Sequence, residues 1–272
     1  MRVLLTNDDG IHAAGLQALR RALLEIPGVE LATIAPDSNR SAVGRGITTR
    51  RPLWVEEIAF GDGTVGYATD GTPVDCVRFA TLGLVDGFTP DLVVSGINHG
   101  SNLGDDITYS GTVAAALEGI VLGLPAVAVS QQSRAGEMDF RLGREFDFAA
   151  AARFTARLVE EIEEVPLPEG TLLNVNAPGD APRGVELTSL GKRIYRDRLR
   201  LQEDDGESRR LFHIYGGDIS YEEKDGTDLA AVAAGRIAVT PIHFDLTDRA
   251  GLDALSVYDL ARLVEPAAHE VE

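Results

Sequence analysis

The sequence has one cysteine, two lysines and no long apolar run. The single thiol, Cys76, excludes an internal disulfide framework and a cysteine-rich zinc site. No stretch reaches the roughly 18 apolar residues that a bilayer crossing needs. The first residues, MRVLLTNDDG, turn polar too soon for the apolar core of a signal peptide. We therefore expect a cytoplasmic protein.

Acidic residues outnumber basic ones in this 272-residue chain, with 43 Asp and Glu against 25 Lys and Arg and a net charge of −18. This balance argues against binding to nucleic-acid polymers and against docking on anionic membranes. Two explanations for this acidity and scarcity of lysine stay open. One is adaptation to high salt, where repulsion between like charges is screened, and the other is a gene that favours arginine codons.

The first two thirds of the chain alternate apolar runs with helical patterns. Apolar runs fit for strands cover Arg2–Thr6, Val29–Ala35, Leu53–Ala59, Thr64–Ala68, Leu92–Ser95, Ala126–Ser130 and Leu172–Val175. Helical spacing covers Ala13–Ile26, Val74–Leu84, Gly111–Leu122 and Arg141–Glu164. Strands separated by helices predict a Rossmann-like, doubly wound α/β fold with a mostly parallel sheet.

The pattern changes near Gly184. Strand-like segments at Val185–Leu190, Arg210–Tyr215 and Arg236–His243 follow one another without regular helices between them. We predict a Rossmann-like body over residues 1–183 and a β-rich extension over residues 184–250. A C-terminal helix at Leu255–Val264 and a tail fill residues 251–272.

Two adjacent carboxylates, Asp8 and Asp9, follow the first predicted strand. Successive residues of a strand point to opposite faces, so the two can act together only where the backbone turns, and Gly10 permits such a turn. Close carboxylates repel each other, and a hard divalent cation would relieve the repulsion. For the dipeptide alone, a solvated turn is the more ordinary interpretation.

Ligands in a doubly wound sheet bind beyond the carboxyl ends of the strands. The loop after the second strand offers Arg40 and Ser41, and the loop after Leu92–Ser95 offers Asn98. That loop runs on to Ser110, Gly111 and Thr112 at a helix start, where free N–H groups could hold an anion or Ser110 and Thr112 could simply cap the helix. Together these groups predict a metal-dependent phosphoester site.

The remaining reactive residues carry weaker signals. No pair of histidines has zinc-ligand spacing, and only His99 falls in a candidate loop, where it could contact substrate or act as a general acid. Cys76 lies in the apolar stretch Val74–Leu84 and is expected to be a small core residue.

The ordered motifs resemble the SurE (survival protein E) family of metal-dependent 5′-nucleotidases. The matching segments are Thr6-Asn7-Asp8-Asp9-Gly10, Ala35-Pro36-Asp37, Arg40-Ser41-Ala42, Asp70-Gly71-Thr72-Pro73, Ser95-Gly96-Ile97-Asn98, Tyr109-Ser110-Gly111-Thr112, Leu173-Asn174-Val175-Asn176-Ala177-Pro178, Thr227-Asp228 and Val239-Thr240-Pro241. The resemblance implies a homodimer or homotetramer, with residues 184–250 as the oligomerisation region, and one Mg²⁺ or Mn²⁺ per subunit. It also implies that Asp8, Asp9, Ser41 and Asn98 bind this metal and that Ser110, Gly111 and Thr112 bind phosphate.

The leading hypothesis is hydrolysis of nucleoside 5′-monophosphates, with Asp8, Asp9 and Asn98 as the catalytic set and Asn7 and Arg40 as further substrate contacts. A broader nucleotide or polyphosphate phosphatase is an alternative. An aspartyl-phosphate enzyme of the haloacid dehalogenase kind would need the aspartates separated by one residue. A receiver-like Mg²⁺-binding module would be about half this length.

Overall fold

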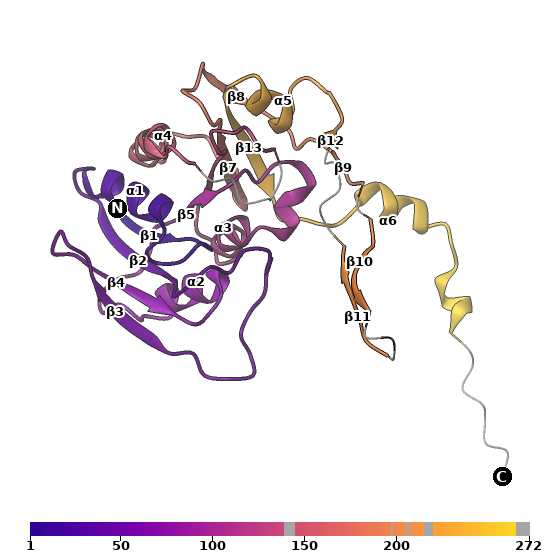
Figure 1. Cartoon of the computed structure of the whole chain (residues 1–272), viewed down its shortest axis with the longest axis horizontal. Helices are drawn as coiled ribbons and strands as arrows, with labels where there is room; N and C mark the ends of the chain where they lie inside the picture. The colour runs from indigo at the N-terminus through magenta and orange to yellow at the C-terminus, as the bar shows by residue number, and fades with distance from the viewer. Residues whose placement is uncertain (139–144, 197, 205, 207, 215–219, 265–272) are drawn as a thin grey trace, which may run out of the picture.

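The computed structural model describes residues 1–138, 145–196, 198–204, 206, 208–214 and 220–264 (Figure 1). Its centre is a nine-stranded sheet with the order β3-β4-β2-β1-β5-β6-β7-β13-β8. The strands are β1 (Arg2–Thr6), β2 (Glu30–Pro36), β3 (Val55–Ala59), β4 (Val65–Thr69), β5 (Leu92–His99), β6 (Ala126–Gln131), β7 (Thr171–Ala177), β8 (Val185–Leu187) and β13 (Ile237–His243). Only the pairs β3–β4 and β7–β13 are antiparallel within this sheet. The predicted α/β class with a mostly parallel sheet is confirmed.

Helices cover both faces of the sheet, which makes the fold doubly wound (Figure 1). The helices are α1 (Ala14–Leu24), α2 (Pro73–Thr81), α3 (Gly111–Val121), α4 (Ala149–Glu160), α5 (Asp228–Ala233) and α6 (Arg249–Leu255). Helices α1 and α4 bury their apolar sides in one core, whereas α2 and α3 bury theirs in a second core on the other face. Cys76 is fully buried in this second core, as predicted. Among the described residues, no helix has both the length and the apolarity that a bilayer crossing requires.

Local sequence explains why the central elements form where they do. Val3, Leu4 and Leu5 of β1 are all fully buried, which suits a central strand covered on both faces. Helix α2 starts at a capping box between Thr72 and Asp75, with Pro73 in the first turn.

Three predicted helical features were wrong. Helix α4 begins at Ala149 rather than near Arg141, and residues 139–144 lie outside the described part of the chain. The predicted helix at Leu255–Val264 is instead the short α6, which ends at Leu255, and a 3₁₀ turn, η2 (Leu260–Leu263). Helix α5 lies in the region where no helix was expected.

The segment between β8 and β13 leaves the sheet and returns to it. It forms two small antiparallel pairs, β9 (Arg193–Ile194) with β12 (Ser220–Tyr221) and β10 (Arg200–Asp204) with β11 (Arg210–His213). The β10–β11 hairpin projects from the body, and α6 leads the chain away from it (Figure 1). The division at residue 183 stays a prediction, although β8 and β13 belong to the central sheet.

Candidate functional site

The candidate site lies at the carboxyl edge of three neighbouring parallel strands, β2, β1 and β5. Because these strands run in the same direction, the segments that follow them meet at one edge of the sheet. The sequence predicted that Asn98 and His99 lie in a loop after Ser95. Strand β5 instead extends to His99, so both residues lie at the end of this strand. A 3₁₀ turn, η1 (Gly104–Tyr109), then leads into α3.

The turn after β1 is built by Asn7 and Gly10. The Asn7 side chain donates to the Gly10 carbonyl at 3.1 Å and accepts the Gly10 N–H at 3.2 Å. Gly10 has a φ of +106°, and a Cβ there would lie 3.3 Å from the backbone of Ser38. This agrees with the expectation that Gly10 permits the turn. Because Asn7 is fully buried and both ends of its amide bind Gly10, its side chain shapes the loop.

Asp8 is buried beneath the first turn of α3. Its side chain accepts a hydrogen bond from Thr112 Oγ1 at 2.5 Å, and a Cβ added to Gly111 would lie 2.7 Å from Asp8 Cβ. Burial, reinforced by the adjacent charge of Asp9, raises the pKa of Asp8 to about 6. The start of α3 therefore lies against this carboxylate, with no room for a side chain at Gly111.

Asp9 is held by backbone and side-chain donors from the two neighbouring strand ends. The N–H of His99 donates to Asp9 Oδ2 at 3.0 Å, and Asn39 Nδ2 donates to Asp9 Oδ1 at 3.2 Å. Burial raises the pKa of Asp9 to about 6, although the bond from His99 opposes this shift. The sequence reasoning did not single out Asn39, and its place within an Asp-Ser-Asn cluster was the only signal for it.

Asn98 and the Ser41 segment reach the same edge. Asn98 Nδ2 donates to the Gly100 carbonyl at 2.8 Å, and its Oδ1 accepts no hydrogen bond from the residues that the structure describes. The Arg40 N–H donates to the Asp8 carbonyl at 2.6 Å, which places the backbone beside Ser41 next to the carboxylates. Ser41 itself is exposed. The Arg40 guanidinium forms an ion pair with Asp37 at 2.7 Å.

The helix start at Ser110–Thr112 is capped by a side chain and also presents backbone N–H groups that can bind an anion. Ser110 Oγ accepts the Val113 N–H at 3.0 Å, so the capping interpretation holds for this residue. The first N–H groups of a helix have no acceptor inside the helix, and they form its positive end. In α3 this end lies against the Asp8 carboxylate.

His99 is packed as a neutral ring. Its Nε2 accepts the Gly15 N–H at 3.1 Å, and its ring stacks on Phe148 at 4.9 Å and on Phe146 at 5.2 Å. Because Nε2 accepts a hydrogen bond, the proton of the neutral ring is on Nδ1. Burial lowers the pKa of His99, which favours this neutral form. These contacts fit a residue that orients Asp9 through its backbone better than one that acts as a general acid.

The donor set at this edge suits a hard cation. Asp8, Asp9, Ser41 and Asn98 offer only oxygen atoms, which Mg²⁺, Mn²⁺ and Ca²⁺ prefer. The raised pKa values of the buried Asp8 and the half-buried Asp9 are a further reason, since a cation would offset both the desolvation and the repulsion of these carboxylates. Across the described ranges, no cluster of three or more His, Cys, Asp or Glu side chains offers another metal site.

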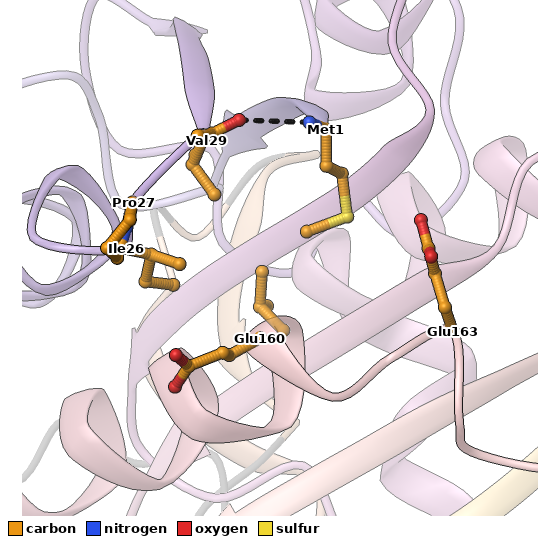
Figure 2. A pocket seen from close by; sticks show the side chains of 8 residues that line it. Met1, Ile26, Pro27, Val29, Glu160 and Glu163 are labelled. Atoms are coloured by element: carbon orange, nitrogen blue, oxygen red, sulfur yellow. Dashed lines mark hydrogen bonds between the residues drawn. The ribbon is translucent and has the colours of Figure 1, made fainter.

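A hollow at the opposite edge of the sheet does not suit a phosphate ester. It is lined by Met1 and Val29, which flank the amino ends of β1 and β2, and by Glu160 and Glu163 near the end of α4 (Figure 2). The ammonium group of Met1 donates a hydrogen bond to the Gly28 carbonyl at 3.0 Å. The two glutamates would repel an anion, so this hollow is not part of the candidate site.

Comparisons with known proteins agree in family and fold. A family model described as survival protein SurE matches residues 3–197. The 5′-nucleotidase SurE of Rubrobacter xylanophilus is 52% identical over 267 residues, which cover 97% of this chain and 99% of that protein. The 5′-nucleotidase SurE of Carboxydothermus hydrogenoformans is 43% identical over 95% of this chain and 96% of its own length. The crystal structure of a SurE protein from Aquifex aeolicus superimposes with a TM-score of 0.77 at 34% identity and covers 94% of this chain and 98% of that one.

Proposed function

The chain belongs to the SurE family, and on this premise we propose that it is a 5′-nucleotidase, which hydrolyses nucleoside 5′-monophosphates to nucleoside and phosphate. One observation carries the proposal: the buried Asp8, next to Asp9 in the chain, lies against the start of α3, where a helix can bind an anion. The relatives named above bear the same activity in their names. A net charge of −18 favours a small nucleotide over a nucleic-acid polymer as substrate.

The proposed cofactor is one divalent cation per subunit, Mg²⁺ or Mn²⁺, held by Asp8, Asp9, Ser41 and Asn98. The oxygen-only donor set supports this assignment, as does the use of the Asn98 amide donor by Gly100, which leaves its oxygen as the ligand atom. When bound, such a cation polarises a phosphoryl oxygen and lowers the pKa of water.

The chain itself binds and orients the substrate. The N–H of Gly111 at the first turn of α3 holds an oxygen of the phosphate and stabilises charge that develops on the transferring group, whereas the Thr112 N–H donates a hydrogen bond to Asp8. Thr112 fixes the orientation of the Asp8 carboxylate through its hydroxyl. Asp9, whose pKa burial raises to about 6, accepts a proton from the attacking water. The Arg40 backbone binds Asp8, so we expect its guanidinium, which pairs with Asp37, to contact the anionic substrate. Asn7 supports the turn that carries Asp8.

We also propose a homodimer or homotetramer in which residues 184–250 and the C-terminal segment 251–272 contact another subunit, with residues 1–183 as the catalytic body. Exposed apolar side chains on these segments support the proposal, because a monomer would leave them in water. They include Leu201, Leu211, Phe212, Leu252, Leu255, Leu260 and Leu263.

Replacement of one carboxylate tests the function. Asp8→Asn removes a charged ligand, and we expect Mn²⁺-dependent release of phosphate from AMP to fall at least about 100-fold, beyond the 10–100-fold typical of residues that merely support a ligand. Asp86→Asn, at an exposed position between α2 and β5, is the control for the loss of one charge. Activity of Asp8→Asn that survives with unchanged metal dependence would show that the assignment is wrong. A panel of mononucleotides and polyphosphates then defines the substrate range.

A further inference from the structure

The loop that carries Ser41 is long and irregular, yet it is fixed at several points. Residues 37–54, here called the Ser41 loop, connect β2 to β3 without a helix or strand. Near one end, the Arg40 N–H binds the Asp8 carbonyl at 2.6 Å. Further along, the Gly46 carbonyl accepts from Thr72 Oγ1 at 2.8 Å, and the Thr48 N–H donates to Asp75 at 3.1 Å.

The strongest of these attachments is an ion pair to a buried carboxylate of α3. Glu118 is 3% exposed, and Arg45 of the Ser41 loop contacts it at 2.7 Å. Arg78 of α2 contacts the other oxygen of the same carboxylate at 2.5 Å. A buried carboxylate is stable only when paired, so two guanidinium groups hold this charge in place. The Arg45 guanidinium also lies 4.3 Å from the centre of the Phe244 ring, a cation–π contact.

The short segment between the two attachments restricts Ser41. Arg40 is bound to Asp8 and Arg45 to Glu118, so only four residues lie between the fixed points. Ala42 within this segment has a φ of +61°, a conformation that side-chain-bearing residues adopt rarely. Such a conformation persists where the surroundings impose it, which is consistent with a segment held at both ends.

Helix α3 thus contacts both sides of the candidate metal site. Its first turn lies against Asp8, and Glu118, about two turns further along, holds the Ser41 loop. We propose that Arg45 and Glu118 are positioning residues, which fix Ser41 relative to Asp8 and Asp9 for metal binding. This inference rests on the proposed function, because it takes Ser41 as a metal ligand.

The two arginines on Glu118 provide a matched pair of variants. Arg45→Met and Arg78→Met each remove one guanidinium from the same buried carboxylate, but only Arg45 belongs to the Ser41 loop. Mn²⁺ affinity is measured from the electron paramagnetic resonance signal of free Mn²⁺. We expect Arg45→Met to weaken binding roughly 10-fold, as loss of a supporting residue does, and Arg78→Met to stay within about twofold of the wild type. Arg45→Lys, which keeps the charge, should recover most of the affinity.

A second readout needs no metal. Hydrogen exchange at the amides of residues 41–46 in the metal-free protein should accelerate in Arg45→Met and not in Arg78→Met. Thermal unfolding verifies that both variants are folded. If Arg45→Met does not fold, Phe244→Leu removes the cation–π face while Glu118 keeps both arginines, and a smaller loss of Mn²⁺ affinity is expected.

The outcomes separate this inference from the proposed function. Equal Mn²⁺ affinities and equal exchange rates in Arg45→Met and Arg78→Met would overturn the positioning role while the function stands. A wild-type protein that binds no Mn²⁺ would overturn both. An unchanged Mn²⁺ affinity in Phe244→Leu, if that variant is the one used, would also overturn the positioning role.

Discussion

The contact between Gly111 and Asp8 gives a quantitative prediction for Gly111→Ala. The added methyl carbon would lie 2.7 Å from Asp8 Cβ and 2.8 Å from Asp8 Oδ2. Carbon atoms in contact are normally about 3.5–4.0 Å apart, so Asp8 and the start of α3 must separate by roughly 1 Å. Neither side can yield easily, because Asp8 is buried and Thr112 binds it at 2.5 Å.

This displacement should reduce turnover far more than it reduces stability. A 1 Å misplacement of catalytic groups costs on the order of 100-fold in rate, and we expect kcat/KM for AMP to fall by about this factor. The conformation of Gly111 is helical, and alanine has the higher helix propensity, so the backbone itself does not resist the change. The variant should therefore fold.

The assay is release of phosphate from AMP at saturating Mn²⁺, with thermal unfolding followed in parallel. Gly119→Ala in the same helix is the control, because its methyl group would meet the ends of the Val93 and Ala126 side chains at 3.0–3.2 Å, away from Asp8. It should alter stability modestly and leave kcat/KM within about twofold. A folded Gly111→Ala with wild-type kcat/KM would refute the reasoning.

Four further predictions concern protons, buried charge and salt. Because burial raises the pKa of Asp8 and Asp9 to about 6, Mn²⁺ affinity should fall as the pH drops below 6. A Mn²⁺ affinity that does not change between about pH 7 and pH 5 would contradict this. The metal-free folded protein binds these two protons more tightly than the unfolded chain does, so protonation of Asp8 and Asp9 stabilises the fold at low pH. This stabilisation should be lost as pH rises from about 4 through 6. In urea denaturation, Asp8→Asn should reduce this dependence of the unfolding free energy on pH. Arg193→Met leaves the buried Asp106 without the guanidinium at 2.7 Å and should cost about 3–5 kcal/mol, whereas Arg236→Met, in an exposed pair with Glu186, should cost less than about 1 kcal/mol. If repulsion among the acidic residues opposes folding, molar KCl should raise Tm, and an unchanged or lower Tm would exclude adaptation to salt.

The sequence was sufficient for strands β1 to β7 of the central sheet and for the edge on which the site lies. Strands buried on both faces, such as Arg2–Thr6, appear as continuous apolar runs, and Pro73 marks the start of α2. Once parallel strands were inferred, the rule that ligands bind beyond their carboxyl ends selected the residues around Asp8 and Asn98.

Other features depend on contacts that no local pattern encodes. Helix α4 starts late because Phe146 and Phe148 stack on His99, and Asp147 accepts the Ala149 N–H at 3.0 Å as the helix begins. The pattern of Ile237–His243 predicts a strand, but its pairing with β7 is not contained in that pattern.

The link between Arg45 and Glu118 was missed for the same reason. The two side chains are 73 positions apart and meet only when the sheet is complete. Spacing along the chain therefore located the carboxylates and not the residues that support them.

The path of the chain between β8 and β13 has a consequence for how this protein can be altered. Ser189 lies beside the return of the chain, where its N–H binds the Gly226 carbonyl at 2.9 Å and its carbonyl accepts the Asp228 N–H at 2.9 Å. These two hydrogen bonds join the start and the end of the segment between β8 and β13, so its base is closed. We therefore expect that the β10–β11 hairpin, which lies beyond this closed base, can be replaced by the equivalent segment of a relative while the central sheet still folds.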